Sequence, residues 1–252
     1  MERVQKDYEH QIDVILLTHN KLENTRRCVE ALYENTHVPF RLTVIDDSTD
    51  ETPEYFFQLN KAKYIRPNVK IKSANHAINL GMKVTQSDPF IFLTNSTFVA
   101  PNWLDKALEI MEDPKVGVVG FKMVSPKTGE IFPSVGFRAR DSYRPDKYDS
   151  ILDVMVVGWA AVLLRREAVF GLDEDYYIGF RGVDDTDNCL EIKRRGWKVI
   201  HNGMGTIYHH PTSSASGTEL GRIETEENLR RFAIKWKPLV TAVSQKEVYH
   251  SS

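Results

Sequence analysis

Residues 90–104, FIFLTNSTFVAPNWL, form a short apolar run that stops at four polar residues and restarts at a proline. The apolar part predicts a buried strand, and residues 101–104 predict the opening of a helix, where proline is common. Such a strand brings residues 94–97 to the edge of a sheet, which is where ligands bind in open α/β proteins. We interpret the stretch as the floor of a binding site. The alternative is a strand that ends in an ordinary polar turn.

Upstream of this floor, strand–helix units repeat. Residues 13–18 (DVILLT) and 40–45 (FRLTVI) are compact apolar runs, each followed by residues typical of a helix. A less regular unit has its strand within residues 63–71 and its helix at about 74–84. Because parallel strands need a crossover, usually a helix, the alternation favours a mostly parallel, Rossmann-type α/β sheet covered on both faces. The chain lacks the glycine-rich loops of dinucleotide-binding folds and P-loops, which disfavours both.

The second half of the chain predicts a smaller antiparallel region. Residues 116–124 form a strand that turns at 125–129 and returns at 131–137, and residues 154–164 are a strong apolar run. The remaining predicted elements are a helix at 184–195 that stops at Gly196, strands at 197–200 and 206–210, and a helix at 219–235. No internal repeat or linker is visible, so we expect a single domain over residues 1–252.

Composition excludes several classes of function. Of the 252 residues 41% are hydrophobic and 27% charged, which suffices for a packed core. The net charge of −2 gives no overall attraction to nucleic acid or to an anionic membrane. No apolar segment follows the charged N-terminus and no run is long enough to span a bilayer, so we expect a cytoplasmic protein. Cys28 and Cys189, the only cysteines, exclude a disulfide framework and are expected to be buried.

Polar clusters follow apolar runs at Asp46 and Asp47, at residues 94–96, and at residues 184–187. If the strands are parallel, the first two clusters lie at the same edge, where a carboxylate can accept hydrogen bonds from a base N–H or a ribose hydroxyl. The alternative is helix capping, which one carboxylate would satisfy. Three acids crowd residues 184–187, and their mutual repulsion should raise at least one pKa, as a general base requires.

In order and spacing, these clusters resemble the motifs of the inverting, nucleotide-sugar-dependent glycosyltransferases of family 2, which have the GT-A fold. The resemblance covers roughly residues 12–210. The matching motifs are Thr18-His19-Asn20, the acidic turn at residues 44–50 (VIDDSTD), the helix segment at 77–81 (AINLG), the floor at 92–104, residues 165–168 (RREA), residues 171–174 (GLDE) and the acidic helix at 184–196. Each motif is loose alone, and the series predicts a GT-A-like domain.

The resemblance implies roles for individual residues. Asp185 falls where the family keeps its catalytic base, and Asp184 and Asp187 would tune or orient it. Gly158 and Trp159 fall where such enzymes shape the acceptor pocket, although a large aromatic residue is as well explained by the core. The donor-binding residues that the resemblance implies are Thr18, Asn20, Asp46, Asp47, Asn79, Gly81, Thr94 and Asn95.

The chain departs from the family at the floor. Where the family has Asp-x-Asp to hold Mg²⁺ or Mn²⁺ on the diphosphate, this chain has Thr94-Asn95-Ser96. Since carboxylates normally hold such a cation, metal binding is expected to be weakened or lost. His209 falls where several family members have a further metal or phosphate contact, so Ser96 and His209 are the candidate metal ligands. Structural histidines are nevertheless commoner than ligands.

The predicted function is transfer of a hexosyl group from a UDP- or dTDP-linked sugar to an acceptor hydroxyl with inversion. About residues 12–115 would bind the donor, about 116–210 would position the acceptor, and 211–252 would form a flexible loop and a C-terminal helix. The expected acceptor is a glycan, a lipid carrier, a protein or a small molecule. Residues 212–217 are either a lid that orders on donor binding or an ordinary surface loop.

Three interpretations stay open. The first is a transferase with a weakly held metal, and the second is a metal-independent one in which Arg181, Arg222 or Lys235 neutralises the leaving group. The third is a sugar-nucleotide or glycan-binding protein whose catalysis has lapsed. The acidic helix tells against the third, because a binder needs no base there. A sugar nucleotidyltransferase would need a glycine-rich loop after the first strand, and His19-Asn20-Lys21 is not one.

Overall fold

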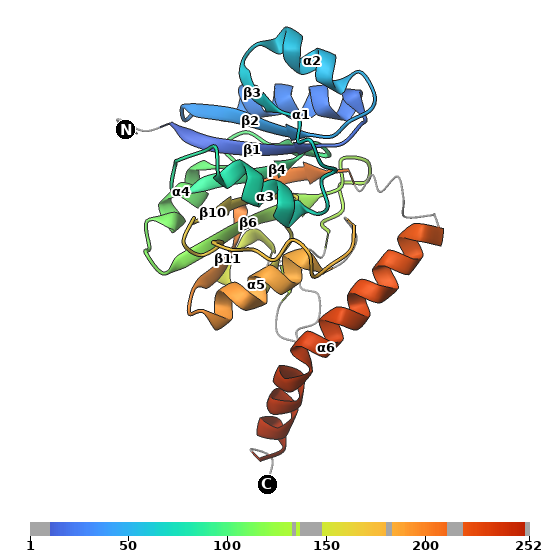
Figure 1. The fold of residues 1–252 in the computed structure, drawn as a ribbon. Coiled ribbons are helices and arrows are strands. Elements are labelled where there is room, and N and C mark those ends of the chain that lie inside the picture. Colours follow the sequence, from blue (N-terminus) through green and yellow to red (C-terminus); the bar gives the residue numbers. More distant parts are fainter. Residues whose placement is uncertain (1–10, 133–134, 137–147, 180–182, 211–218, 250–252) are drawn as a thin grey trace, which may run out of the picture.

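The computed structural model describes residues 11–132, 135–136, 148–179, 183–210 and 219–249. Its centre is a nine-stranded sheet with the strand order β3-β2-β1-β4-β10-β6-β11-β5, and β8 pairs with β11 beside this path (Figure 1). A separate two-stranded sheet joins β7 and β9. Strands from both halves of the chain therefore share the large sheet.

The first part of this sheet is parallel, formed by β3 (Ala62–Ile65), β2 (Phe40–Asp46), β1 (Ile12–Thr18) and β4 (Phe90–Thr94). Thr18 of β1 lies beside Asp46 of β2, and Leu17 lies beside Thr94 of β4. The carboxyl ends of these strands therefore meet at one edge, which brings two of the polar clusters together.

The second part of the sheet is mixed. Its strands are β10 (Ala161–Leu164), antiparallel to β4 and to β6 (Val116–Val124); β11 (Lys198–His209), parallel to β6; and β5 (Thr97–Val99) and β8 (Ile151–Asp153), both antiparallel to β11. β7 (Val135–Gly136) pairs with β9 (Val156–Val157). The predicted α/β class, with a mostly parallel sheet and a smaller antiparallel region, is confirmed.

Helices cover both faces of the sheet. The first face packs against α1 (Leu22–Asn35), α2 (Thr52–Leu59) and α4 (Asp105–Met111), and the second against α3 (Ala74–Met82) and α5 (Asp184–Arg194). Within β1, Val14 and Leu16 belong to the first core, and Ile15 and Leu17 to the second. Because successive side chains of a strand point to opposite faces, a strand covered on both sides needs a continuous apolar run.

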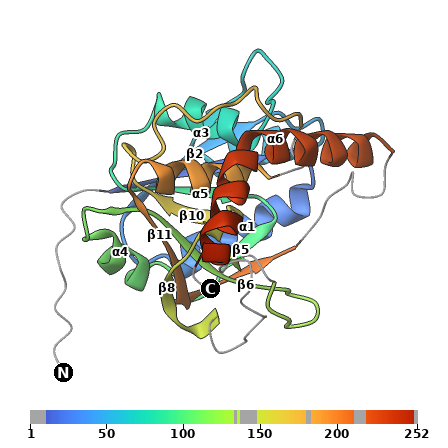
Figure 2. The same cartoon turned by 90° about the horizontal axis from the view of Figure 1, so that it is seen from below.

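The last helix, α6 (Glu219–Tyr249), has 31 residues, whereas the sequence predicted it only to about residue 235. It passes beside α5 in both views, and its C-terminal end extends away from the sheet (Figures 1 and 2). Among the helices of the described ranges, none combines the length and the apolar character needed to cross a lipid bilayer.

The floor stretch differs from its prediction after Thr94. Residues 101–104 form turns, and α4 begins only at Asp105, so the predicted helix opening at Pro101 is wrong. Asn102 has a left-handed backbone (φ 58°), which is incompatible with a helix starting there. The strand β5 was not predicted, because three residues give no usable periodicity.

Two predicted strands at residues 197–200 and 206–210 are one strand, β11, with a register shift between Asn202 and Thr206. Glycines permit this shift between closely packed backbones. A Cβ on Gly203 would lie 2.2 Å from the Tyr148 carbonyl oxygen, and a Cβ on Gly205 would lie 2.4 Å from that of Trp103.

The predicted hairpin after β6 is only partly correct. The turn forms, since the Ser125 N–H donates to the Glu130 carbonyl (2.8 Å) and Val124 bridges Ile131. The return strand, however, leaves β6, because Val135–Gly136 pairs with β9. The apolar run at residues 154–164 likewise divides into β9 and β10, and the residues between these strands belong to the site described next.

Candidate active site

The acidic turn after β2 contains a carboxylate that faces inward. Asp46 is fully buried, and its Oδ1 accepts hydrogen bonds from the Thr18 hydroxyl (2.6 Å) and the Ser48 N–H (3.1 Å). Its Oδ2 accepts one from the Tyr64 hydroxyl (2.6 Å). Burial and this bond raise the pKa of Tyr64 to about 12. Asp46 therefore fastens β1, β2 and β3 together and has no surface of its own at the edge of the sheet.

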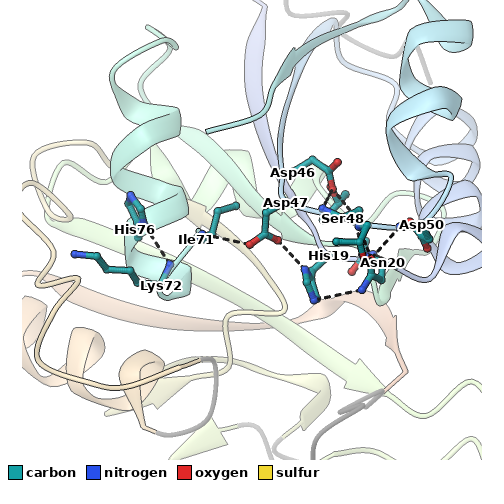
Figure 3. A network of polar contacts seen from close by, with 12 residues as sticks. His19, Asn20, Asp46, Asp47, Ser48, Asp50, Ile71, Lys72 and His76 are labelled. Carbon is teal, nitrogen blue, oxygen red and sulfur yellow. Dashed lines mark hydrogen bonds and ion pairs between the residues drawn. The ribbon is translucent and has the colours of Figure 1, made fainter. Parts of the chain in front are cut away.

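Asp47, the residue after Asp46, reaches the surface, and its side chain is 12% exposed. Its Oδ1 lies 2.7 Å from His19 Nδ1, and its Oδ2 accepts a hydrogen bond from the Ile71 N–H at 3.2 Å (Figure 3). Asp47 thus joins the loops that follow β1 and β2 to the segment that leads into α3. A ligand at this edge would meet Asp47 and His19 before it could reach Asp46.

Asn20 connects the β1 loop to both of its neighbours. Its Oδ1 accepts hydrogen bonds from the N–H groups of Thr49 (2.7 Å) and Asp50 (3.3 Å), and its N–H donates to the Ser48 hydroxyl (2.6 Å). Its carbonyl accepts a hydrogen bond from Asn95 Nδ2 (2.9 Å). Asn20 has a φ of 56°, a left-handed conformation that asparagine tolerates better than most residues. The motif asparagine therefore fixes the loop geometry.

The floor turn is tied to the chain that precedes β10. The Thr94 N–H donates to the Ala160 carbonyl (2.9 Å), and the hydroxyls of Thr94 and Thr97 each lie 3.2 Å from the same oxygen. The Thr94 hydroxyl also lies 3.3 Å from that of Ser96. The floor is a cluster of neutral oxygens held against residue 160.

β11 brings His209 to this floor. His209 Nδ1 lies 3.3 Å from the Thr97 hydroxyl and 3.5 Å from the Ser96 hydroxyl, which is 113 positions away in the sequence. Burial, with a smaller contribution from His210, lowers the pKa of His209 to about 4. The imidazole is therefore neutral at pH 7, and one of its two ring nitrogens is an acceptor.

The two candidate metal ligands do lie together, but they fit a stably held divalent cation poorly. Ser96 and His209 offer a hydroxyl and an imidazole, with no carboxylate beside them. Over the ranges that the structure describes, no group of three or more His, Cys, Asp or Glu side chains is arranged to hold an ion. Hard cations such as Mg²⁺ normally take one or two carboxylates, so the residues present do not match the metal that the family implies.

Three acids occupy the first turn of α5, and two of them have raised pKa values. Burial, and then the charge of Asp184, raise the pKa of Asp185 to about 7, although hydrogen bonds donated by Thr186 and by the Trp159 N–H work in the opposite direction. Burial is also the main cause of the raised pKa of Asp184, and the charge of Asp187 adds to it. Crowding of the acids raises these pKa values, as the sequence predicted, but burial raises them more.

Asp187 has partners of a different kind. It is 4% exposed, and its two oxygens accept hydrogen bonds from Lys235 Nζ and Trp236 Nε1 of α6, each at 2.7 Å. Lys235 is therefore paired with a carboxylate and is not available to a leaving group. Arg222 is paired as well, with Glu219 and Glu226 of its own helix.

The Gly158–Trp159 segment contacts the acids through its backbone. The Trp159 indole is 6% exposed and its Nε1–H donates to Cys189 Sγ (3.3 Å), so this side chain belongs to the core. Gly158 is partly exposed.

Cys28 and Cys189 are free and buried, as predicted.

Two residues implied in donor binding hold α3 in place. Asn79 Nδ2 donates to the Leu172 carbonyl (2.8 Å) and to Glu174 Oε2 (3.1 Å). A Cβ on Gly81 would lie 2.6 Å from the Ile15 side chain, so this glycine allows α3 to approach β1 closely. Both contacts hold the helix in its position.

Sequence reasoning missed the contact between α3 and α5. The buried side chains of Asn75 and Asn188 exchange hydrogen bonds of 2.6 and 3.1 Å. The only signal was an asparagine on the apolar face of each predicted helix, where a polar residue needs a partner. Two further candidates, Arg181 and the segment 212–217, lie outside the described residues.

Residues 159 and 160 join the two polar regions. The Trp159 N–H is close enough to Asp185 to lower its pKa slightly, and the next residue, Ala160, accepts hydrogen bonds from the floor at Thr94 and Thr97. The acid with a pKa of about 7 therefore stands next to the neutral floor. A carboxylate of this kind can accept a proton from a hydroxyl group bound between the two regions.

Comparison with known proteins gives one family match. The sequence profile described as "Glycosyl transferase family 2" matches residues 13–170. The chain is 25% identical over 245 residues to the uncharacterized protein y4gI of Sinorhizobium fredii, covering 88% of this chain and 26% of that protein. It is 22% identical over 227 residues to the O-antigen biosynthesis protein RfbC of Myxococcus xanthus, covering 81% and 17%. The chain thus spans about a quarter or less of the length of these relatives.

Several solved structures share the fold. GalNAc-T7 with UDP, GalNAc and Mn²⁺ superposes with a TM-score of 0.63 at 17% identity, covering 84% of this chain and 46% of that one. Mannosyltransferase PcManGT from Pyrobaculum calidifontis, in complex with GDP-Man and Mn²⁺, has the same score and identity and covers 90% and 64%. S. aureus TarS 1–349 gives 0.59 at 14% identity, covering 79% and 60%.

Proposed function

The chain belongs to glycosyl transferase family 2, with the GT-A fold, and on that premise we propose that it transfers a hexosyl group from a nucleoside diphosphate sugar to an acceptor hydroxyl with inversion. Asp185 is the general base. The donor lies along the carboxyl ends of β1, β2 and β4, and the acceptor enters beside residues 158–160 and the first turn of α5.

The observation that carries this proposal is the double contact of residues 159 and 160. Ala160 accepts hydrogen bonds from the hydroxyls of Thr94 and Thr97, and the N–H of the preceding residue, Trp159, is close enough to Asp185 to lower its pKa. A base is useful only within hydrogen-bond reach of the proton it removes. The two adjacent residues bring the carboxylate to the side of the floor where an acceptor would approach a donor sugar.

The reaction follows from these positions. Asp185 accepts the proton of the acceptor hydroxyl while that oxygen attacks the anomeric carbon, and the bond from this carbon to the diphosphate oxygen breaks on the opposite face. Attack from one face and departure from the other invert the configuration. The pKa of about 7 suits the step, because such a base is largely ionised just above neutral pH and still binds a proton well.

Asp47 is the group we assign to the nucleotide base, and Asp46 we assign to positioning the turn. The partly exposed carboxylate of Asp47 can accept the ring N–H of uracil or thymine, which is why we favour a UDP- or dTDP-linked donor. GalNAc-T7 carries UDP and PcManGT carries GDP-Man, so the fold alone does not choose the base.

Metal dependence is proposed to be weakened or lost, because no carboxylate accompanies Ser96 and His209. Positive charge at this end of the site comes from other residues. Burial and, after it, the charges of Lys127, Arg27 and Lys21 lower the pKa of His210, which directly follows His209. We assign Lys127 and Arg27, whose charges act on the residue next to His209, to offset part of the charge on the departing diphosphate.

The acceptor class follows only from the name of one relative. RfbC is an O-antigen biosynthesis protein, which makes a growing glycan or its lipid carrier the acceptor we propose first. A protein or small-molecule acceptor would need the same hydroxyl beside Asp185. A binding protein with lapsed catalysis remains the second candidate, and the raised pKa of Asp185 speaks against it, since a pure binder has no use for a costly buried acid.

The test is a panel of UDP-, dTDP- and GDP-linked sugars, scored for binding by calorimetry and for slow hydrolysis, each with and without a chelator. Turnover that survives chelation supports the metal-independent form, and turnover that chelation abolishes supports a weakly held metal. Binding without turnover under any condition would favour the lapsed binding protein. Absence of binding across the panel would overturn the proposed donor class.

A further inference from the structure

α6 is hydrogen-bonded to residues 176 and 178, which precede the acid cluster at residues 184–187. Asn228 is fully buried, and its side chain accepts a hydrogen bond from the Ile178 N–H (2.9 Å) and donates one to the Ile178 carbonyl (2.8 Å). Arg231 Nη1 donates to the Tyr176 carbonyl (2.7 Å), and the Tyr176 hydroxyl donates to the Arg231 carbonyl (3.0 Å). These directed bonds fix the position of the backbone a few residues before Asp184.

The same helix holds the chain just after the base. Trp236 Nε1 and Lys235 Nζ each donate to one oxygen of Asp187 at 2.7 Å, and Lys235 lies 3.8 Å from Glu191 Oε1. Trp236 is 5% exposed and packs near Phe232, with ring centroids 6.4 Å apart. α6 is therefore bonded to the chain on both sides of Asp184 and Asp185.

Simple packing does not explain these contacts. A helix that only covered α5 would be expected to bury apolar side chains, since a buried polar group gains nothing unless it is bonded. Here an asparagine, an arginine, a lysine and an indole N–H converge on the acid cluster and on the segment before it. Buried polar networks of this kind fix one geometry.

We propose that α6 is the positioning element for the base of the reaction proposed above, and that Lys235 and Trp236 are its positioning residues. They hold Asp187, which does not contact substrate, and through Asp187 they set the orientation of the first turn of α5 and thus of Asp185. Lys235 also offsets the charge of Asp187, so that the repulsion felt by Asp184 and Asp185 stays limited. This inference rests on the proposed function.

The charged groups around Asp185 determine how its pKa responds to a substitution. Among the residues that the structure describes, the titratable groups near the cluster are Asp184, Asp187, Cys189, Glu191 and Lys193 of α5, Tyr177 of the segment before it, and Lys235 of α6. Lys235 is the cation bonded to Asp187, so its removal has a predictable sign. Loss of a nearby positive charge disfavours the ionised carboxylates and raises their pKa values.

The experiment is a titration of the Asp185 carboxyl carbon by NMR in the free protein, with Asp185→Asn used to assign the signal. Lys235→Met keeps the apolar stem, and we expect it to raise the Asp185 pKa by about half a unit or more. Trp236→Phe keeps an aromatic side chain and removes the indole N–H, and we expect a smaller rise in the Asp185 pKa. Ile234→Ala, at a neighbouring side chain that is 58% exposed, is the matched control and should titrate like the wild type.

Kinetics give the second readout. With a donor from the panel, Lys235→Met and Trp236→Phe should lower kcat about tenfold at pH 7 and leave the donor KM within a factor of about two, because positioning of the base acts on the chemical step. A lower melting temperature with an unchanged Asp185 titration and unchanged kcat would show that α6 only stabilises the fold. If Lys235→Met does not fold, the Asp185 titration and the kcat of Trp236→Phe test the proposal. The titration needs no substrate, so it fails or succeeds independently of the transferase assignment.

Discussion

Asp46 and Asp185 are both carboxylates at the ends of apolar stretches, but their surroundings are opposite. Asp46 is enclosed by donors from β1, β3 and its own turn, and no part of it meets solvent. Asp185 keeps some exposed surface and lies beside a second acid, Asp184, which helps to raise its pKa to about 7. A carboxylate surrounded by donors supports the fold, whereas one placed beside a like charge is costly to the fold and available for chemistry.

The two regions also differ in how they are assembled. The donor edge, where β1, β2 and β4 end, is built mainly by neighbouring strands of the sheet, as in the pair of Thr18 in β1 with Asp46 in β2. The acid cluster depends on a partner in α6, 49 positions from Asp187, and on residues 159 and 160. We therefore expect substitutions at the donor edge to act mainly on stability or affinity, and those at the acid cluster to act mainly on kcat.

The largest expected effect is that of Asp185→Asn. This change removes the proton acceptor, and kcat should fall about 10³-fold with donor affinity nearly unchanged. The measurement is steady-state kinetics together with calorimetric donor binding. Transfer retained at more than a tenth of the wild-type rate would move the base to another residue.

Asp185→Asn also tests how much the ionised Asp185 carboxylate destabilises the fold. The ordinary pKa of this carboxyl is 3.8 and the folded value is about 7, so the folded state binds more protons within that window. Stability of the wild type should therefore fall as pH rises from 4 to 7, and kcat should rise through pH 7 as the base ionises. At pH 8, Asp185→Asn should be more stable than the wild type, on the order of 1–2 kcal/mol after allowance for solvent contact. Equal or lower stability of the variant at pH 8 would contradict the assigned cost.

Asp46→Asn should act in the opposite direction on stability. Its amide places an N–H₂ group among donors from Thr18, Ser48 and Tyr64, and we expect a loss of about 2–3 kcal/mol in the free energy of unfolding. Denaturant unfolding measures this loss. Tyr64→Phe removes one donor only and should cost about 1 kcal/mol. An unchanged unfolding midpoint for Asp46→Asn would remove the contrast between the two carboxylates.

Asp47→Ala should weaken nucleotide binding with little effect on folding. The side chain is partly exposed and makes two polar contacts, with His19 and with the Ile71 N–H, so we expect a stability loss of about 1 kcal/mol. Affinity for the nucleotide selected by the panel should fall about tenfold. Calorimetry with the free nucleoside diphosphate gives the affinity. Unaltered affinity would mean that this carboxylate does not contact the base.

Sequence reasoning succeeded where the pattern is local. The apolar runs at 13–18, 40–45 and 90–93 gave the parallel strands, because a strand covered on both faces needs uninterrupted apolar residues. It failed where long-range contacts decide. The three residues of β5 are a strand only because β11 pairs with them. The inward orientation of Asp46 was equally hidden, since its donor Tyr64 lies on a neighbouring strand.

The candidate site divides in the same way. The acidic turn at 184–187 was visible as a cluster in the sequence, and the direction of the pKa shift followed from crowding alone. The partners of Asp187 could not be predicted, because nothing in the sequence of the last helix indicates that Lys235 and Trp236 bind this carboxylate. Motif matching also assigned Asn79 and Gly81 to the donor, although their contacts are with Glu174 and Ile15.

The smallest expected effect is a gain of function at the floor. Ser96→Asp introduces a carboxylate at a position whose wild-type hydroxyl lies 3.5 Å from Nδ1 of the neutral His209 imidazole. The new carboxylate supplies the oxygen ligand that a hard cation needs. Mn²⁺ affinity of the free protein, followed by the loss of its aqueous electron-spin-resonance signal, should rise about tenfold, a gain of about 1.4 kcal/mol. Ser96→Asn, which has nearly the same shape and no charge, is the control and should leave the affinity unchanged. An equal Mn²⁺ affinity for the wild type and Ser96→Asp would mean that the missing carboxylate is not what limits metal binding, and the neutral floor would then need another explanation.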